Sequence, residues 1–358
     1  MSSLLSYLPA AARARLRVLD TFTEHEGAPA PDDAAPSGAA PGGGVSLQTP
    51  LQPEPRAACD RCVMVPVHPD RDPGAPWAFD DGLRCCTHHP AVPNFLVGRT
   101  LMRGGPGVER VRARLATPAS VSAWGIRAPP DRPADTHTLE LRFGRDPDLL
   151  CPFWTGGALA CGIWPERTAS CRTWFCKHER GFDGAQRWWR LGDLLSALER
   201  ALGRFCVDVG AAPESDATTD QWLDWYRWCA ARVDEFDHAD AERLDLSSCE
   251  APRQRLVALR VRPRSMPAVL VPAISALHEH AGGVLIAGYS SYDAVLAPRA
   301  IFAFLALLDG TCPWREALAR TTRERPDPRA AAPGLAHLDE ALIRELYRIG
   351  ALEPASQT

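Results

Sequence analysis

Residues 161–176 read CGIWPERTASCRTWFC and place Cys161, Cys171 and Cys176 in one short segment, with Cys151 shortly before it. Packing alone does not explain four thiols gathered in this way. Ionised thiols this close repel one another unless a cation neutralises them, and the cation both lowers their pKa values and couples folding to metal binding. We therefore expect an irregular, loop-rich module that a metal centre holds in place.

Two further cysteine motifs precede this segment. Cys59-Asp-Arg-Cys62 has the two-residue spacing with which a tight turn brings two thiolates to one metal. Cys85 and Cys86 are adjacent, so their side chains point apart in an extended segment and either serve different metals or leave one thiol buried without a metal. The predicted ligand set is Cys59, Cys62, Cys85, Cys86, Cys151, Cys161, Cys171 and Cys176.

The other cysteines, and the histidines beside the motifs, are not expected to bind metal. These residues are Cys206, Cys229, Cys249, Cys312, His88, His89 and His178. Cys206 and Cys229 lie on apolar faces of expected helices, where a buried thiol packs as a small hydrophobic side chain. Histidine is a common metal ligand, but the cysteines alone already supply enough ligands for one site, so the histidines are not needed.

The ligand types do not identify the metal, because four thiolates suit both tetrahedral zinc and an iron–sulfur cluster. Eight cysteines could hold one centre with spare thiols or two centres. The spacing differs from the Cys-x3-Cys-x2-Cys pattern of radical enzymes, since four residues separate Cys171 from Cys176 and no third cysteine follows. We expect Trp154, Trp164 and Trp174 to contribute to a hydrophobic shell around the metal, together with Trp188 and Trp189.

Length and charge narrow the class of protein. The chain has 358 residues, enough for two or three domains, and a formal net charge of −4 that gives no attraction to nucleic acid or anionic membranes. Lys177 is the only lysine, an arginine bias typical of a GC-rich bacterial genome. The N-terminus lacks the features of a secretory signal, and no stretch is long and apolar enough to span a bilayer. We expect a cytoplasmic protein whose thiols stay reduced.

The predicted fold class is α+β, and composition divides the chain into five segments. They are an N-terminal amphipathic helix (1–25), a flexible linker rich in Ala, Pro and Gly (26–56), the cysteine-cluster metal-binding module (57–190), packing helices (191–265) and a small helical, winged-helix-like unit (266–358).

Apolar periodicity locates several elements. Two amphipathic helices are expected over residues 191–205 and 222–236. In the last segment, three helices are expected over residues 299–308, 314–320 and 338–349, where Asp309-Gly310 closes the first and Gly350 the third. Strands are expected at residues 137–143 and 284–287.

The cysteine motifs resemble the CxxCxxCC or YkgJ-like family of zinc- or iron-chelating domains. That family shows a paired cysteine and then Cys-x-Ile-Tyr-x-x-Arg-Pro-x-x-Cys-Arg-x-Phe-x-Cys. The similar stretches here are Cys85-Cys86-Thr87, Cys151-Pro-Phe153, Cys161-Gly-Ile163-Trp164 and Cys171-Arg172-Thr-Trp174-Phe175-Cys176, with Arg167 at the start of the Arg-Pro position. Trp164 replaces the usual Tyr, Thr168 replaces the usual Pro, and a long insertion separates Cys62 from Cys85.

The resemblance covers about a third of the chain and implies metal chelation without naming a reaction. Members resembling flagellin lysine N-methylases carry a similar cluster. This likeness keeps open a peptide- or protein-modifying enzyme, a methylase-like maturation factor with an auxiliary iron–sulfur cluster, which would bind S-adenosylmethionine.

The C-terminal pattern, from Phe302 through Asp309-Gly310 to the helix that ends at Gly350-Ala-Leu352, is similar to small winged-helix domains of the PqqD type. That resemblance implies a peptide or protein partner, with addition of a strand to a sheet edge as one mode of binding.

Our leading hypothesis from the sequence is a metal-binding protein with a structural or redox-active centre and a docking unit at its C-terminal end. The alternatives are the modifying enzyme and a metal-responsive regulator. The sequence identifies no catalytic residue.

Overall fold

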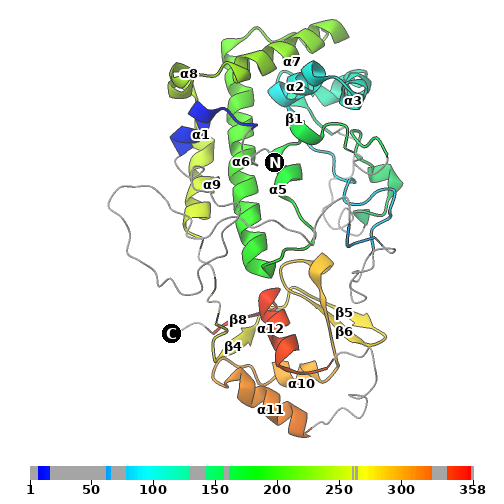
Figure 1. Cartoon of the computed structure of the whole chain (residues 1–358), viewed down its shortest axis with the longest axis vertical. Helices are drawn as coiled ribbons and strands as arrows, with labels where there is room; N and C mark the ends of the chain where they lie inside the picture. Colours follow the sequence, from blue (N-terminus) through cyan, green and yellow to red (C-terminus); the bar gives the residue numbers. More distant parts are fainter. Residues whose placement is uncertain are drawn as a thin grey trace.

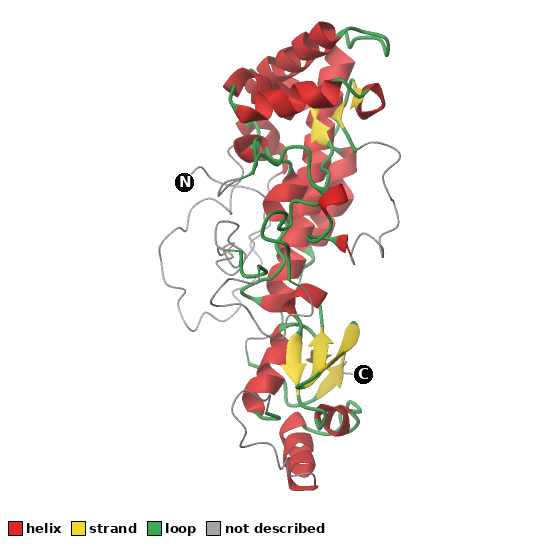
Figure 2. Cartoon of the chain, turned by 90° about the vertical axis from the view of Figure 1, so that its right-hand side faces the viewer, coloured by secondary structure: helices red, strands yellow, loops and turns green. Residues whose placement is uncertain are grey.

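The computed structural model describes residues 7–16, 62–65, 78–128, 142–156, 161–259, 262, 265–324 and 337–355. Its elements are helices and short antiparallel strands, which confirms the predicted α+β class. The molecule is elongated, with a long helix along its upper part and a smaller unit at its lower end (Figure 1). Most of the strands belong to that lower unit (Figure 2).

Helix α6 (Gly181–Val209) is the axis of the larger part. Leu191, Leu195, Leu198 and Leu202 follow one another at three- or four-residue steps and are completely buried, so one face of the helix forms core along much of its length. This confirms the helix expected over 191–205, which begins earlier than the periodicity indicated.

Helix α7 (Thr219–Asp234) confirms the second expected helix. A capping box holds its start, because the Thr218 hydroxyl accepts from the Gln221 backbone and the Gln221 side chain accepts from the Thr218 backbone. Helix α2 (Asn94–Arg103) packs against α7 so closely that a Cβ at Gly98 would lie 1.8 Å from the Tyr226 carbonyl oxygen. Glycine is therefore required at this crossing.

Shorter elements complete the larger core. They are α1 (Ala10–Leu16), α3 (Pro106–Leu115), α8 (His238–Arg243), α9 (Ser247–Val257), and an antiparallel sheet of β1 (Val92–Pro93), β3 (Gly125–Ile126) and β2 (Val121–Ser122). Of the expected N-terminal helix, the part within the described residues is α1, and the linker expected at 26–56 lies outside the described residues.

The segments that carry the cysteines have few regular elements in the parts described. These are the short 3-10 turns η3 (Pro118–Ser120), η4 (Pro147–Leu149) and η5 (Trp164–Glu166), and the helix α5 (Ala169–Thr173). Most of the strand expected at 137–143 lies outside the described residues, and its last two residues, Arg142 and Phe143, lie in a helical turn rather than a strand.

The C-terminal unit has its own core around Phe304, Trp314, Ile343 and Leu346. Strands β5 (Ala276–His280), β6 (Gly283–Ala287) and β7 (Val295–Ala297) form an antiparallel sheet in that order, and β4 (Leu270–Pro272) pairs with β8 (Leu352–Pro354). The helices are α10 (Ile301–Leu305), α11 (Trp314–Glu324) and α12 (Glu340–Arg348), with η6 (Ser291–Asp293) before β7.

These elements confirm the three helices and the strand expected from the sequence of this unit, but the sequence reading missed β4, β5, β7 and β8. The four missed strands are only three to five residues long and only partly buried. β5 and β8 contain charged or polar residues, and the apolar residues of β4 and β7 run directly into Pro272 and Pro298, which obscures a strand pattern. None of the helices in the described ranges combines the length and apolarity needed to cross a membrane.

Candidate metal centre

Cys62 and Cys176 meet in a small buried cluster apart from the two larger cores. Their exposed fractions are 9% and 6%. Cys62 opens a turn closed by the hydrogen bond from the Val65 amide to the Cys62 carbonyl, 3.2 Å, and Cys176 follows α5. Two thiols distant in the sequence thus share one apolar environment, which Val63, Met64, Val65 and Phe79 complete.

The electrostatics of this pair oppose ionisation. Burial raises the pKa of the Cys176 thiol to about 12, and negative charge on Cys62 adds to that increase. The positive charge of Lys177 acts in the opposite direction and lowers the pKa of Cys176. Both thiols can therefore ionise together at neutral pH only if a further cation compensates their charge.

Aromatic side chains enclose the pair. Phe143 lies between Phe79 and Trp174, with ring centroids 5.7 and 5.0 Å apart, and Tyr292 of the C-terminal unit lies 5.4 Å from Phe79. Of the tryptophans expected near a metal, Trp174 packs against this cluster, whereas Trp188 belongs to the larger core.

The adjacent cysteines divide between two surroundings. Cys85 packs against the Cys62–Cys176 cluster. The carbonyl of Cys86 accepts a hydrogen bond of 2.7 Å from the amide of Cys151. Both cysteines lie in one turn, in which Arg84, directly before them, is in the left-handed region with a φ of 51°.

Cys151 and Cys161 pack against the larger helical core. An isolated antiparallel β-bridge pairs Trp154 with Cys161, and the Gly162 amide donates a hydrogen bond of 2.8 Å to the Phe153 carbonyl. Cys151 and Cys161 are therefore packed apart from the Cys62–Cys176 cluster.

Cys171 lies within α5, in a third environment. Burial raises the pKa of its thiol, while hydrogen bonding to Thr168 and the positive charge of Arg167 lower it. The groups that act most strongly on this thiol include no other cysteine. The short helix explains the separation: it ends at Thr173, so the chain turns before it reaches Cys176.

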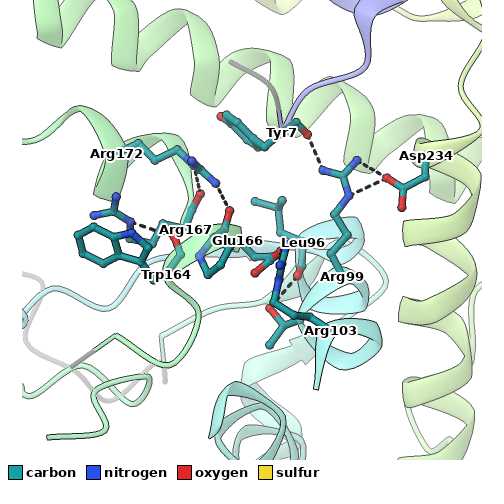
Figure 3. A network of polar contacts seen from close by, with 11 residues as sticks. Tyr7, Leu96, Arg99, Arg103, Trp164, Glu166, Arg167, Arg172 and Asp234 are labelled. Carbon is teal, nitrogen blue, oxygen red and sulfur yellow. Dashed lines mark hydrogen bonds and ion pairs between the residues drawn. The ribbon is translucent and has the colours of Figure 1, made fainter. Parts of the chain in front are cut away.

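Arginines hold this segment in place (Figure 3). Arg172 donates to the carbonyl oxygens of Pro165 and Arg167, and Arg103 of α2 donates to the buried carboxylate of Glu166 at 2.6 and 2.8 Å. The guanidinium of Arg167 lies 3.5 Å from the centre of the Trp164 ring. Arg167 and Arg172 thus hold the backbone between Cys161 and Cys171 through hydrogen bonds to its carbonyl oxygens.

Glu199 of α6 is a buried carboxyl that the sequence reading missed. Its Oε1 accepts hydrogen bonds from the Tyr7 hydroxyl and the Ala169 amide, both 2.7 Å, so it joins the N-terminal segment and α5 to α6. Burial raises its pKa to about 7. The sequence did contain a signal for it: Glu199 stands among apolar residues on the core-facing side of the expected helix, and a carboxyl buried there needs hydrogen-bond partners.

The eight predicted ligands are thus distributed over the described structure. Cys62, Cys176 and Cys85 share a cluster, Cys86 contacts Cys151 through the backbone, and Cys59 lies outside the described residues. Within the ranges that the structure describes, no three His, Cys, Asp or Glu side chains are arranged to hold a metal ion. Cys206 and Cys229 are completely buried in the larger core, which confirms the packing role expected for them.

Comparison with known proteins adds no relative: no family model, no curated protein and no solved structure matches this chain.

Proposed function

We propose that this protein holds zinc or an iron–sulfur cluster through a thiolate centre built on Cys62 and Cys176, with Cys85 and Cys59 as further ligands. The observation that carries the proposal is the burial of Cys62 and Cys176 in one apolar cluster, close enough that charge on Cys62 acts on Cys176. Cys59 belongs to it by the two-residue spacing to Cys62, and Cys85 by its packing on the same cluster.

A metal accounts for features that simple packing does not. Negative charge on Cys62 opposes the ionisation of Cys176, as Cys206 does for Cys229 in the helical core. The Cys62–Cys176 cluster differs in having a third thiol, Cys85, packed against it and the positive charge of Lys177 acting on it. A bound cation converts that repulsion into ligation, and structural zinc contributes about 10 to 16 kcal/mol of apparent binding free energy at neutral pH. The aromatic shell would exclude water from the metal and so favour thiolate ligation.

The test is metal content after purification without oxygen, measured as zinc, iron and acid-labile sulfide per chain. Cys62→Ser and Cys176→Ser should each lower the metal content by half or more. Cys249→Ser is the matched control, because Cys249 is as deeply buried, with 1% exposed, but packs in the helical core. Unchanged content in both cluster variants would contradict the proposal, and so would an intact mass two hydrogens lighter, which indicates a disulfide.

We also propose a second function, binding of an extended peptide along β5. This strand is at an edge of the β5-β6-β7 sheet, and in the described structure no strand pairs with its outer side. Its residues alternate between half-buried and exposed, and the Leu277 side chain is 47% exposed. An edge of this kind offers backbone groups to an added strand and an apolar contact to a peptide side chain. The three-stranded β5-β6-β7 sheet followed by three helices also fits the PqqD-type resemblance, with the β4-β8 pair closing the unit at its two ends.

This second function is tested with peptides selected from a random displayed library against the whole protein and then synthesised. A bound peptide should slow amide hydrogen exchange in residues 276–280, and Leu277→Asp should weaken binding tenfold or more, because a buried hot-spot contact is worth about 2 kcal/mol. Val209→Asp is the control, since Val209 is similarly exposed but lies at the end of α6. Equal losses in both variants, or no protection of β5, would contradict the proposal.

The hypotheses of a modifying enzyme and of a metal-responsive regulator have no specific arrangement in their favour among the described residues, and we propose neither.

A further inference from the structure

A cavity of about 160 Å³ is enclosed by the last turns of α6, the end of α8 and the connection from α8 to α9. Its apolar lining comes from α6 and consists of Ala201, Phe205 and Val209. None of its lining residues belongs to the Cys62–Cys176 cluster or to β5. The cavity is therefore a site apart from both proposed functions.

The apolar floor of the cavity is held in place by packing. Ala201 and Phe205 are buried, whereas Val209 at the end of α6 is 44% exposed. The Phe205 ring meets Phe236 edge to face, with ring centroids 5.1 Å apart, and the guanidinium of Arg232 lies 5.0 Å from its centre. These contacts fix the ring before any ligand arrives, which lowers the entropic cost of binding at this floor.

Two carboxylates at the rim of the cavity already have partners. Oδ2 of Asp208 lies 3.6 Å from Nε of Arg204, which also lines the cavity. Oδ1 of Asp245 accepts a hydrogen bond of 2.9 Å from the amide of Ser247, where α9 begins. The rim therefore offers a ligand no carboxylate that lacks a partner within the described structure.

Arg243 is the cation that this balance leaves over. It is the last residue of α8, lines the cavity and is exposed. Among the described residues no carboxylate lies within ion-pair distance of its guanidinium, and Asp240, in the turn before it, is paired with Arg232. A guanidinium presents its donors as a planar fork that fits a carboxylate with two parallel hydrogen bonds. The cavity thus combines an apolar floor with a carboxylate-binding group at its rim.

The volume sets the size of the apolar part of a ligand. A protein cavity of about 150 Å³ holds a benzene molecule, so this cavity has room for a body of about six carbon atoms. We propose that the cavity binds a small monocarboxylic acid, such as an aromatic acid, with its carboxylate on Arg243 and its apolar body against Phe205 and Val209. A dicarboxylate fits less well, because its second charge would lie on the apolar floor without a partner.

The test uses the whole protein and para-fluorobenzoate, whose binding is followed by fluorine NMR. We expect saturable binding of one molecule per chain and displacement by unlabelled benzoate. Benzamide has a similar shape without the charge, and benzylamine carries the opposite charge. Each should compete at least tenfold more weakly than benzoate, because the charge-assisted hydrogen bonds to Arg243 are lost.

Arg243→Gln tests the carboxylate-binding group. This variant should weaken the binding of para-fluorobenzoate tenfold or more, and it should fold normally because Arg243 is exposed. Arg227→Gln is the matched control, since Arg227 is also a largely exposed arginine but pairs with Asp224 of α7, outside the cavity. Its affinity for para-fluorobenzoate should equal that of the natural protein.

Ala201→Leu tests the apolar floor, because the larger side chain would fill the cavity and should abolish binding while Arg243 remains. Val209→Asp tests the same lining at an exposed position that does not disturb the core, and it should weaken binding tenfold or more. If Ala201→Leu does not fold, Val209→Asp decides the role of the lining.

The outcomes do not depend on the metal content of the protein, so this inference stands or fails separately from the proposed metal centre. Saturable binding that requires both Arg243 and the apolar lining supports it. No saturable binding at millimolar ligand, equal losses in Arg243→Gln and Arg227→Gln, or tighter binding of benzylamine than of benzoate would overturn it.

Discussion

At the residue scale, the decisive feature is that similar cysteines lie in three different surroundings. Cys176 has another thiol, an ammonium group and an aromatic shell around it. Cys171, five positions earlier, has a threonine hydroxyl and an arginine. The sequence motif predicts a metal site in this segment, but it could not assign these surroundings, because Cys176 comes into one cluster with Cys62 only through long-range packing.

Glu199 predicts a dependence of stability on pH. Its pKa rises from 4.5 to about 7 in the folded protein, so between these pH values the folded chain holds a proton that the unfolded chain has released. The free energy of unfolding should therefore fall as the pH rises from about 4.5 to about 7, by at most about 3 kcal/mol, and not change further above that range. Below it both states are protonated and the full contribution is present.

Glu199→Gln tests this prediction, because glutamine keeps the shape and the acceptor but does not titrate. Urea unfolding at several pH values should show a flatter profile for the variant than for the natural protein. Tyr7→Phe is the companion variant. It removes a hydrogen bond that lowers the pKa of Glu199, so the fall should extend to higher pH. Parallel profiles for all three proteins would show that Glu199 titrates normally.

At the scale of the elements, helices were predictable where one face is buried along several turns. The leucines of α6 and the aromatic residues of α7 repeat at helical spacing, and both helices form as expected. The short strands β4, β5, β7 and β8 were not predictable, because three to five residues give too short a pattern and each strand is defined by its pairing with a neighbour.

The crossing of α2 and α7 gives a prediction at this scale. Gly98→Ala should lower the free energy of unfolding by about 1 to 3 kcal/mol, because its Cβ would meet the Tyr226 carbonyl oxygen and force the helices apart. Gly203→Ala in α6 is the control, since the nearest atom to its Cβ, Asn94 Oδ1, would be 3.4 Å away. The free energies of unfolding of both variants are measured by thermal unfolding. Equal losses of stability in Gly98→Ala and Gly203→Ala would contradict the close crossing of α2 and α7.

At the scale of the whole molecule, the account depends on contacts between segments far apart in the chain. Cys62 meets Cys176, and Lys177 meets Asp293 across the junction with the C-terminal unit. Periodicity and spacing describe local structure only, so neither contact could be predicted from the sequence. Composition showed Lys177 to be the only lysine, but an arginine bias gave no indication that this lysine would be buried beside Asp293.

The metal-thiolate centre is the central claim, and X-ray absorption at the metal edge of the protein purified without oxygen tests it most directly. The account predicts zinc or iron with sulfur neighbours at about 2.3 Å, and fewer protein sulfur neighbours in Cys176→Ser. A metal surrounded only by oxygen and nitrogen, or a protein with no bound metal, would contradict it.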